Sequence, residues 1–273
     1  MAGRLEGKVA VVPGGASGIG RATAIRFAEE GASVVVADLN PTRGDETVQA
    51  VRRSGQEAVF VEVDTTSEED NERMADIAVQ TFGRLDILMA AAGISHAGYV
   101  SGGSDELPAG GGESAPDREA AVDAQMLNWE RVLNVNLNGV MLSDRACGQR
   151  MVDLGNGGSI INVSSVMAKL PRAGGEAYCV SKVGVWMLTK CLALELVGQG
   201  IRVNAIGPGF IDTPMSDMLQ NDETLNRWVM SMTPMKRWGE PVEIADAAVF
   251  LASDEASFFT GELLHPDGGL FTE

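Results

Sequence analysis

Short apolar runs alternate with longer amphipathic segments along most of this chain. The runs occupy residues 8–12, 33–37, 58–63, 86–90, 159–164 and 201–206. Because nearly every position in them is apolar, they are typical of parallel strands that are covered on both faces. The amphipathic segments lie near residues 18–30, 41–54, 67–82, 125–153 and 176–198. A further helix is expected to start at Pro241, a good first-turn residue, and to run to about Ser253.

This alternation predicts an α/β fold, in which a doubly wound, mainly parallel Rossmann-type sheet of about seven strands has helices on both faces. With 273 residues, 45% of them hydrophobic, the chain is long enough to bury one large core. We therefore expect a single domain over residues 1–273. Such sheets bind ligands at the carboxyl ends of their strands, so the functional residues are expected there.

One segment, residues 97–123, interrupts the pattern. It is rich in glycine and acidic residues, and Arg118 is its only basic residue. Loops of this length are usually functional or disordered. We expect a mobile loop insertion without chemistry of its own, although its place after the fourth strand leaves open a flap over the site.

The charge balance excludes several partners. The 21 basic residues against 38 acidic ones give a net charge of −17, which repels nucleic acids and anionic membranes. No run of 18 uncharged apolar residues occurs, so we expect a cytoplasmic protein without a membrane span.

Cysteines and histidines are few. Cys147, Cys179 and Cys191 are odd in number and lack CxxC spacing, and the two histidines lie far apart in the sequence. Neither a disulfide framework nor a metal site is therefore expected. Cys179 is expected to act as a small, buried apolar residue.

The first strand runs into a glycine turn, VVPGGASGIGRATA. Gly14, Gly18 and Gly20 stand where a strand must turn sharply into a helix whose free amides can face a pyrophosphate. Glycines alone are weak evidence, since tight turns of any kind use them. Their place between a strand and a helix makes a dinucleotide site the better interpretation.

Asp38 ends the second strand, 18 residues after Gly20. A carboxylate at this point would hold the ribose hydroxyls of NAD and repel the 2′-phosphate of NADP. NAD is therefore the expected cofactor. Arg21 and Arg43 lie close enough in the sequence to keep NADP as the alternative.

The stretch AYCVSK holds Tyr178, one of only two tyrosines, with Lys182 four positions later. Residues i and i+4 share a helix face, about 5–6 Å apart at Cβ. A lysine ammonium there is expected to stabilise the phenolate and to lower the tyrosine pKa from about 10. By itself, this spacing more often marks a surface pair.

Taken together, these motifs resemble the short-chain dehydrogenase/reductase family of the "classical" type, over nearly the whole chain except residues 97–123. The glycine turn is similar to that family's TGxxxGxG, and Tyr178 with Lys182 to its YxxxK. The further matches are Asp64–Thr65 at the family's DV position, Asn136 in NVNLNG, Ser165 thirteen residues before the tyrosine, and Pro208–Gly209 at its PG motif.

The resemblance implies a catalytic set of Asn136, Ser165, Tyr178 and Lys182. Tyr178 would take the hydroxyl proton of an alcohol while hydride leaves its carbon, and Lys182 would hold the nicotinamide ribose. Ser165 would hydrogen-bond the reacting oxygen, and Asn136 would support a water relay from Lys182. A serine at a strand end and an asparagine at a helix kink also have purely structural interpretations, but the complete set favours catalysis.

The resemblance also implies that one NAD-binding domain holds the substrate site. The implied cofactor contacts are Gly14, Ser17, Gly18, Ile19, Gly20, Asp38, Leu39, Asp64, Thr65, Ala90, Gly93, Tyr178, Lys182, Pro208, Ile211 and Thr213.

The chain departs from the family pattern at three places. Pro13 stands where the family has threonine, and Ala90–Ala91 replace two asparagines that precede Ala92–Gly93. In the family, that threonine and the first asparagine help to tie the first and fourth strands together. Since this chain lacks both of these polar side chains, we predict a dry apolar contact between Pro13 and the Ala90 region, with cofactor binding retained. Pro266 is expected to shorten the last strand.

Residues 212–238 correspond to the family's substrate lid. The methionines and tryptophans of this segment are Met215, Met218, Met230, Met232, Met235, Trp228 and Trp238. Methionine adapts to irregular apolar shapes, which favours a hydrophobic, uncharged alcohol or ketone as the substrate. Ordinary helix packing explains these residues equally well. Met167 is also expected in the pocket.

Two other functions stay open. A 3-oxoacyl-carrier-protein reductase would dock an acidic carrier protein; Asp38 and the net charge count against it, although Arg145, Arg150 and Arg172 could form a local basic patch. A catalytically silent NAD-binding scaffold or sensor would have no need of the four catalytic residues. Finally, the resemblance implies a homo-oligomer, a tetramer or dimer, built through the helices at 125–153 and 176–198.

Overall fold

The computed structural model describes residues 3–99 and 118–272, which are arranged around one parallel sheet with the strand order β3-β2-β1-β4-β5-β6-β7. The strands are β1 (Val9–Pro13), β2 (Ser33–Asp38), β3 (Ala58–Glu62), β4 (Ile87–Ala90), β5 (Gly158–Val163), β6 (Ile201–Ile206) and β7 (Leu263–Leu264). All six neighbouring pairs are parallel. The predicted doubly wound α/β fold is confirmed. The direction of winding reverses between β1 and β4, the point where such sheets bind ligands.

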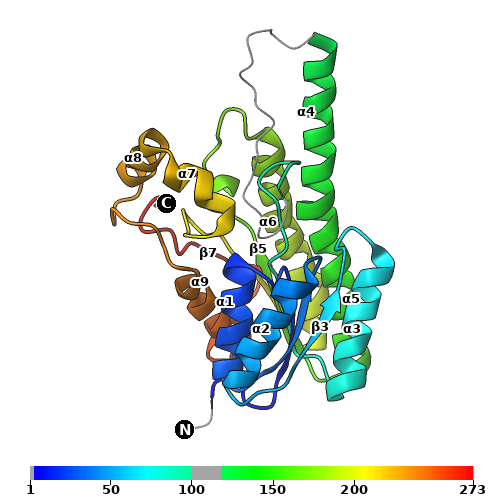
Figure 1. The fold of residues 1–273 in the computed structure, drawn as a ribbon. Helices are drawn as coiled ribbons and strands as arrows, with labels where there is room; N and C mark the ends of the chain where they lie inside the picture. Colours follow the sequence, from blue (N-terminus) through cyan, green and yellow to red (C-terminus); the bar gives the residue numbers. More distant parts are fainter. Residues whose placement is uncertain (1–2, 100–117, 273) are drawn as a thin grey trace.

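Helices cover both faces of the sheet (Figure 1). One face carries α1 (Gly18–Glu29), α2 (Pro41–Arg53) and α9 (Pro241–Ala252), and the other carries α3 (Glu68–Phe82), α5 (Gly139–Leu154) and α6 (Glu176–Leu196). Successive strand residues serve opposite faces: Ala10 and Val12 belong to the first core, and Val9 and Val11 to the second. This alternation explains why the strands read as unbroken apolar runs.

The helix predicted over residues 125–153 is not continuous. The structure has α4 (Arg118–Leu133), a π-helical turn (Asn134–Asn138) and then α5. Residues 118–123, predicted as part of the loop insertion, therefore belong to a helix, while residues 100–117 lie outside the described part of the chain. In the two described ranges, no helix combines the length and the apolarity needed to cross a bilayer.

The departures at Pro13 and Pro266 have direct structural counterparts. Pro13 and Ala90 are both buried, and the ends of β1 and β4 are joined by the main chain, with the Ala91 N–H donating to the Pro13 carbonyl at 3.1 Å. Proline can accept this bond although it has no N–H of its own. At the other edge, β7 ends at Leu264, two residues before Pro266, so the predicted shortening is confirmed.

A buried carboxyl group, which no motif had indicated, lies between α5 and the sheet. Asp144 is 1% exposed, and one of its oxygens accepts a hydrogen bond from Asn162 Nδ2 at 2.9 Å. Asn162 in turn donates to Thr189 Oγ1 at 3.1 Å. Burial raises the pKa of Asp144 to about 8, because the charged form loses its hydration.

The stability of the protein should therefore fall as the pH rises from about 4 to about 8. Over this interval the folded chain keeps the Asp144 proton, whereas an unfolded chain, with an ordinary pKa of 3.8, has released it. Asp144→Asn removes this contribution and is expected to raise the free energy of unfolding at pH 8 by about 2–4 kcal/mol. Urea unfolding at a series of pH values checks this. The matched control is Asp153→Asn, an exposed position on the same helix. If the free energy of unfolding changed with pH in the same way in the wild type, Asp144→Asn and Asp153→Asn, the role given to Asp144 would be contradicted.

Candidate active site

The glycine turn between β1 and α1 has a backbone that side chains would disturb. Gly14 and Gly18 have φ of +78° and +50°. A Cβ on Gly20 would lie 2.1 Å from the Gly14 carbonyl oxygen. Ser17, the N-cap residue of α1, makes no side-chain capping bond, so the first turn of this helix offers backbone donors to an anion. This arrangement fits the pyrophosphate of a dinucleotide.

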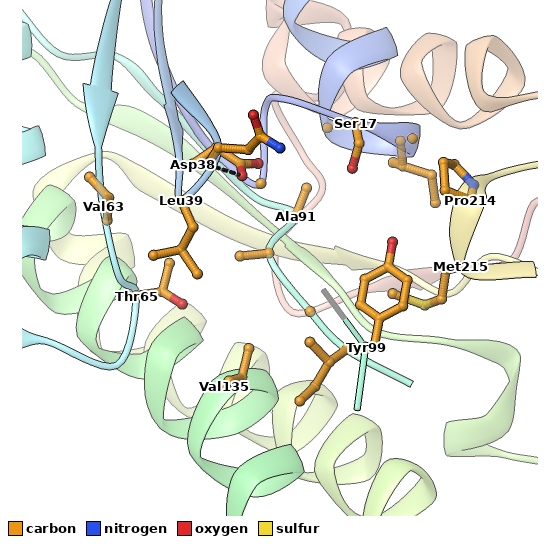
Figure 2. A pocket seen from close by; sticks show the side chains of 18 of the residues that line it. Ser17, Asp38, Leu39, Val63, Thr65, Ala91, Tyr99, Val135, Pro214 and Met215 are labelled. Atoms are coloured by element: carbon orange, nitrogen blue, oxygen red, sulfur yellow. Dashed lines mark hydrogen bonds between the residues drawn. The ribbon is translucent and has the colours of Figure 1, made fainter. Parts of the chain in front are cut away.

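Asp38 lies at the carboxyl end of β2, with 5% of its surface exposed. Its two carboxylate oxygens accept hydrogen bonds from the backbone N–H of Ala16 and of Asn40, both at 3.1 Å. The neighbouring Leu39 is 60% exposed. Figure 2 shows Asp38 and Leu39 on one wall of a cavity and Ser17 and Pro214 on the other.

This first cavity, of about 430 Å³, runs across the carboxyl ends of the strands. Most of the predicted cofactor residues line it: Gly14, Ser17, Gly18, Ile19, Gly20, Asp38, Leu39, Asp64, Thr65, Gly93 and Thr213. The predicted residues that do not line it are Ala90, Tyr178, Lys182, Pro208 and Ile211. Ala90 and Pro208 are buried. Lys182 lies behind Gly93: a Cβ added to this glycine would lie 3.5 Å from the lysine Nζ.

Several residues that line this cavity were not among the predicted cofactor contacts, although Met215 was expected in the substrate lid. They are Asn40, Pro41, Val63, Ala91, Ala92, Ile94, Tyr99, Arg131, Val135, Pro214 and Met215. Most of them flank a predicted residue in the sequence, and that neighbourhood was a usable signal. Tyr99, Arg131 and Val135 reach the cavity only through folding. Figure 2 shows the Tyr99 ring beside Met215, with its hydroxyl directed into the cavity.

Tyr178 and Lys182 lie one turn apart on α6. Tyr178 is half-buried, while Lys182 is 4% exposed. The ammonium of Lys182 donates to the Val163 carbonyl at 2.9 Å and lies 5.6 Å from the centroid of the tyrosine ring. Ser165, just after β5, caps a short 3₁₀ turn by accepting the Met167 N–H at 3.1 Å, and its side chain also hydrogen-bonds Tyr178. The surface-pair interpretation of this tyrosine and lysine is wrong.

Asn136 lies in the π-helical turn, fully buried. Its Oδ1 accepts the Ile94 N–H at 2.8 Å, and its Nδ2 donates to the Ile94 carbonyl at 2.9 Å and to Ser181 Oγ at 3.2 Å. A Cβ added to Gly93 would lie 3.3 Å from this Oδ1 and 3.5 Å from the Lys182 Nζ, so both polar groups border the same face of the glycine. The asparagine therefore ties the segment that follows β4 to α6 beside the lysine, which is more than satisfying a helix kink. Single π turns of this kind often occur at functional sites.

The pKa values correct one expectation. Burial raises the pKa of Tyr178 above its ordinary value of 10.0, and the hydrogen bond with Ser165 opposes this only in part. Burial also lowers the pKa of Lys182 to about 8. The predicted lowering of the tyrosine pKa by the lysine is therefore wrong for the protein alone. The reason is that the ammonium is directed to the Val163 carbonyl, while the phenolate would lose its hydration.

A second cavity, of about 360 Å³, adjoins the first, and Thr213 and Met215 line both. Ser165 and Tyr178 form part of its wall. Its other lining residues are Ser95, His96, Val166, Met167, Arg172, Gly174, Gly175, Cys179, Gly209, Phe210, Ile211, Ser216, Met218, Leu219 and Trp238.

The expectations for this pocket hold in part. Met167, Met215, Met218 and Trp238 line the second cavity, but Trp228 and Met232 are exposed and do not. Cys179 is half-buried and lines the cavity, so its expected full burial is wrong.

Sheets of this topology bind dinucleotides where the strand order reverses, and here a serine, a tyrosine and a lysine from β5 and α6 meet beside that point. A doubly wound sheet with a glycine turn after its first strand is a dinucleotide-binding arrangement that many oxidoreductases share. The family model described as Enoyl-(Acyl carrier protein) reductase matches residues 14–271. The chain belongs to the short-chain dehydrogenase/reductase family.

Individual relatives match along almost the whole chain. The 2,5-dichloro-2,5-cyclohexadiene-1,4-diol dehydrogenase LinX of Sphingobium indicum is 40% identical over 269 residues, covering 98% of each chain. The 3-oxoacyl-[acyl-carrier-protein] reductase FabG of Thermotoga maritima is 38% identical, covering 98% of this chain and 99% of its own.

Solved structures agree with this assignment. A short-chain type dehydrogenase/reductase from Mycobacterium marinum superposes with a TM-score of 0.85 at 29% identity, covering 98% of this chain and 97% of its own. A dehydrogenase from Agrobacterium tumefaciens, solved with bound NADP, has a TM-score of 0.80 at 30% identity and covers 97% of both chains.

Proposed function

We propose that this protein interconverts a secondary alcohol and a ketone on a small, largely hydrophobic molecule, with NAD as the hydride acceptor and Tyr178 as the general acid/base. The observation that carries this proposal is the position of Tyr178 beside Ser165 on the wall of the second cavity, which adjoins the first at Thr213 and Met215. A bound nicotinamide would supply the electrophilic carbon that receives the hydride. The glycine turn and Asp38 would hold the rest of the dinucleotide.

The residues of this chain divide the remaining work. In oxidation the carbinol C–H bond breaks and its electron pair leaves with the hydride, while the O–H proton passes to the Tyr178 oxygen. Ser165 would hydrogen-bond the substrate oxygen, where charge changes during the reaction. Lys182 and Asn136, which lie together beside Gly93, would hold the cofactor ribose and return the proton to solvent through water.

The test is the reduction of NAD, followed by absorbance, over a panel of secondary alcohols. Since the pKa of Tyr178 is raised by burial, its basic form becomes more abundant as the pH rises, and oxidation is expected to accelerate toward alkaline pH. Turnover that increases with pH supports the proposal. Tight NAD binding without any turnover would favour the silent scaffold or sensor instead.

The carrier-protein alternative finds less support in the structure. Arg145 pairs with Glu68 at 3.5 Å, and Arg150 pairs with Glu72 at 2.8 Å and Asp76 at 2.6 Å. Two of the three arginines that could form a docking patch are thus neutralised by carboxylates of α3.

We further propose a cytoplasmic homo-oligomer. Apolar side chains that are exposed on α5 and α6 support an interface between copies of the chain: Met141, Val180, Val183, Met187 and Leu194.

A further inference from the structure

The second cavity contains one arginine and no described acidic residue. Arg172 lies on the loop that leads into α6, and no Asp or Glu occurs among the described residues that line the cavity. The first cavity, in contrast, contains Asp38 and Asp64. Arg172 is exposed at this wall, and the acid nearest to it in the sequence, Glu176, directs its carboxylate to the Gly174 N–H at 3.2 Å.

The described part of the chain places no carboxylate within ion-pair distance of Arg172, whereas many of the other arginines have one. A guanidinium has five N–H donors and no acceptor, and its planar fork matches the two oxygens of a carboxylate. The cavity therefore offers an anion-binding group that pairs with no carboxylate in the described part of the chain.

Arg172 is held in a defined place relative to Tyr178. Its carbonyl accepts the Gly175 N–H at 3.1 Å, and Gly175 is the N-cap residue of α6. The arginine stem passes close to Gly175: a Cβ added to this glycine would lie 3.6 Å from the Cβ and 3.8 Å from the Cδ of Arg172. The guanidinium is thus carried on the turn that immediately precedes the reacting tyrosine.

The rest of the cavity fits a small molecule with an apolar body and a polar end. Val166, Met167, Phe210 and Leu219 supply apolar surface. Ser95, His96 and Arg172 supply polar surface. A volume of about 360 Å³ is near the lower limit for ligand pockets.

We infer that the substrate is a hydroxy acid or its oxo acid, with a carboxylate remote from the reacting carbon, and that Arg172 binds this carboxylate. The inference rests on the proposed function for the reacting group. It replaces the expectation of an uncharged substrate, which came from the methionines alone, with an amphipathic one.

The test compares linear and cyclic hydroxy acids with their methyl esters, which have the same reacting group but no charge. The wild-type enzyme is expected to have a higher kcat/KM for at least one acid than for its ester. Arg172→Gln should lower kcat/KM for that acid about 10- to 100-fold, mainly through KM, and leave the ester within about threefold. For the same acid, the kcat/KM of Arg172→Lys should lie between those of the wild type and of Arg172→Gln, because lysine keeps the positive charge but lacks the planar pair of N–H donors. Arg53→Gln, an exposed position at the end of α2, is the matched control.

A binding experiment separates this inference from the proposed reaction. Calorimetry with NAD and the acids is carried out on Tyr178→Phe and on the double variant that also carries Arg172→Gln. Binding that is lost only in the double variant supports the inference even if no compound is turned over. Turnover of acids and esters at equal rates, unchanged by Arg172→Gln, overturns it while the proposed reaction stands. Absence of acid binding in Tyr178→Phe also overturns it.

Discussion

Replacing Tyr178 with Phe is expected to lower kcat by about 10²–10⁴-fold while NAD binding and the melting temperature stay nearly unchanged. The variant keeps the aromatic ring and removes only the hydroxyl that takes or gives the proton. Ser165 loses one hydrogen bond but still accepts the Met167 N–H, so the cost in stability should be about 1 kcal/mol or less. Steady-state kinetics measure kcat, a fluorescence titration measures NAD binding, and a thermal melt measures the melting temperature.

The adjacent lysine provides the internal comparison. Lys182→Met should also reduce turnover, and it should weaken cofactor binding as well, because the ammonium lies beside Gly93 at the edge of the first cavity. Lys190→Met, two turns further along α6, where the lysine packs over Trp186, is the matched control and should have little effect. If Tyr178→Phe kept the wild-type kcat, the acid/base assignment would have to be abandoned.

Replacing Asp38 with Ser is expected to change the cofactor preference by about 100-fold. The native preference, measured as the ratio of kcat/KM for NAD to that for NADP, should be well above one, because the carboxylate repels a 2′-phosphate and can accept from ribose hydroxyls. Loss of a charged acceptor costs about 1.5–3 kcal/mol, or about 10- to 100-fold in NAD efficiency, and relief of the repulsion adds to the shift toward NADP.

The structure adds a qualification to this result. Asp38 also accepts the backbone N–H groups of Ala16 and Asn40, so the variant should melt at a lower temperature. Asp38→Asn, which retains one acceptor oxygen, should show a smaller loss of stability. Asp45→Asn, an exposed carboxylate on α2, makes the same change in net charge and should leave the ratio unaltered. A native enzyme that prefers NADP would contradict the role given to Asp38.

Much of the fold could be predicted because the relevant signals are local. Apolar runs of strand length and amphipathic segments of helix length predicted the parallel sheet, and the glycine turn followed from its place between Val12 and the first helix. Pro241 marked a helix start that the structure has at the same residue. Boundaries failed at the start of α4, which begins at Arg118 within the predicted loop insertion, and at the π-helical turn around Asn136. One extra residue in a turn leaves little trace in apolar periodicity.

The candidate site was predictable to a similar extent, and for the same reason. The i, i+4 spacing placed Tyr178 and Lys182 on one helix face, and the family resemblance added Ser165 to them. The sign of the tyrosine pKa shift was not predictable from spacing. It depends on how deeply the hydroxyl is buried and on where the lysine ammonium is directed, and both are set by residues distant in the sequence.

The sequence by itself determined the class of fold, the glycine turn that fits a dinucleotide, and the position of the acid/base tyrosine proposed here, since each is written in residues that are close along the chain. Only the tertiary structure decided that Arg172 enters a cavity without described acids, that Asp144 is sealed against Asn162, and that Asn136 reaches Ile94. Burial, dielectric environment and shared cavity walls arise from the packing of segments that are far apart in the sequence. No local pattern encodes them.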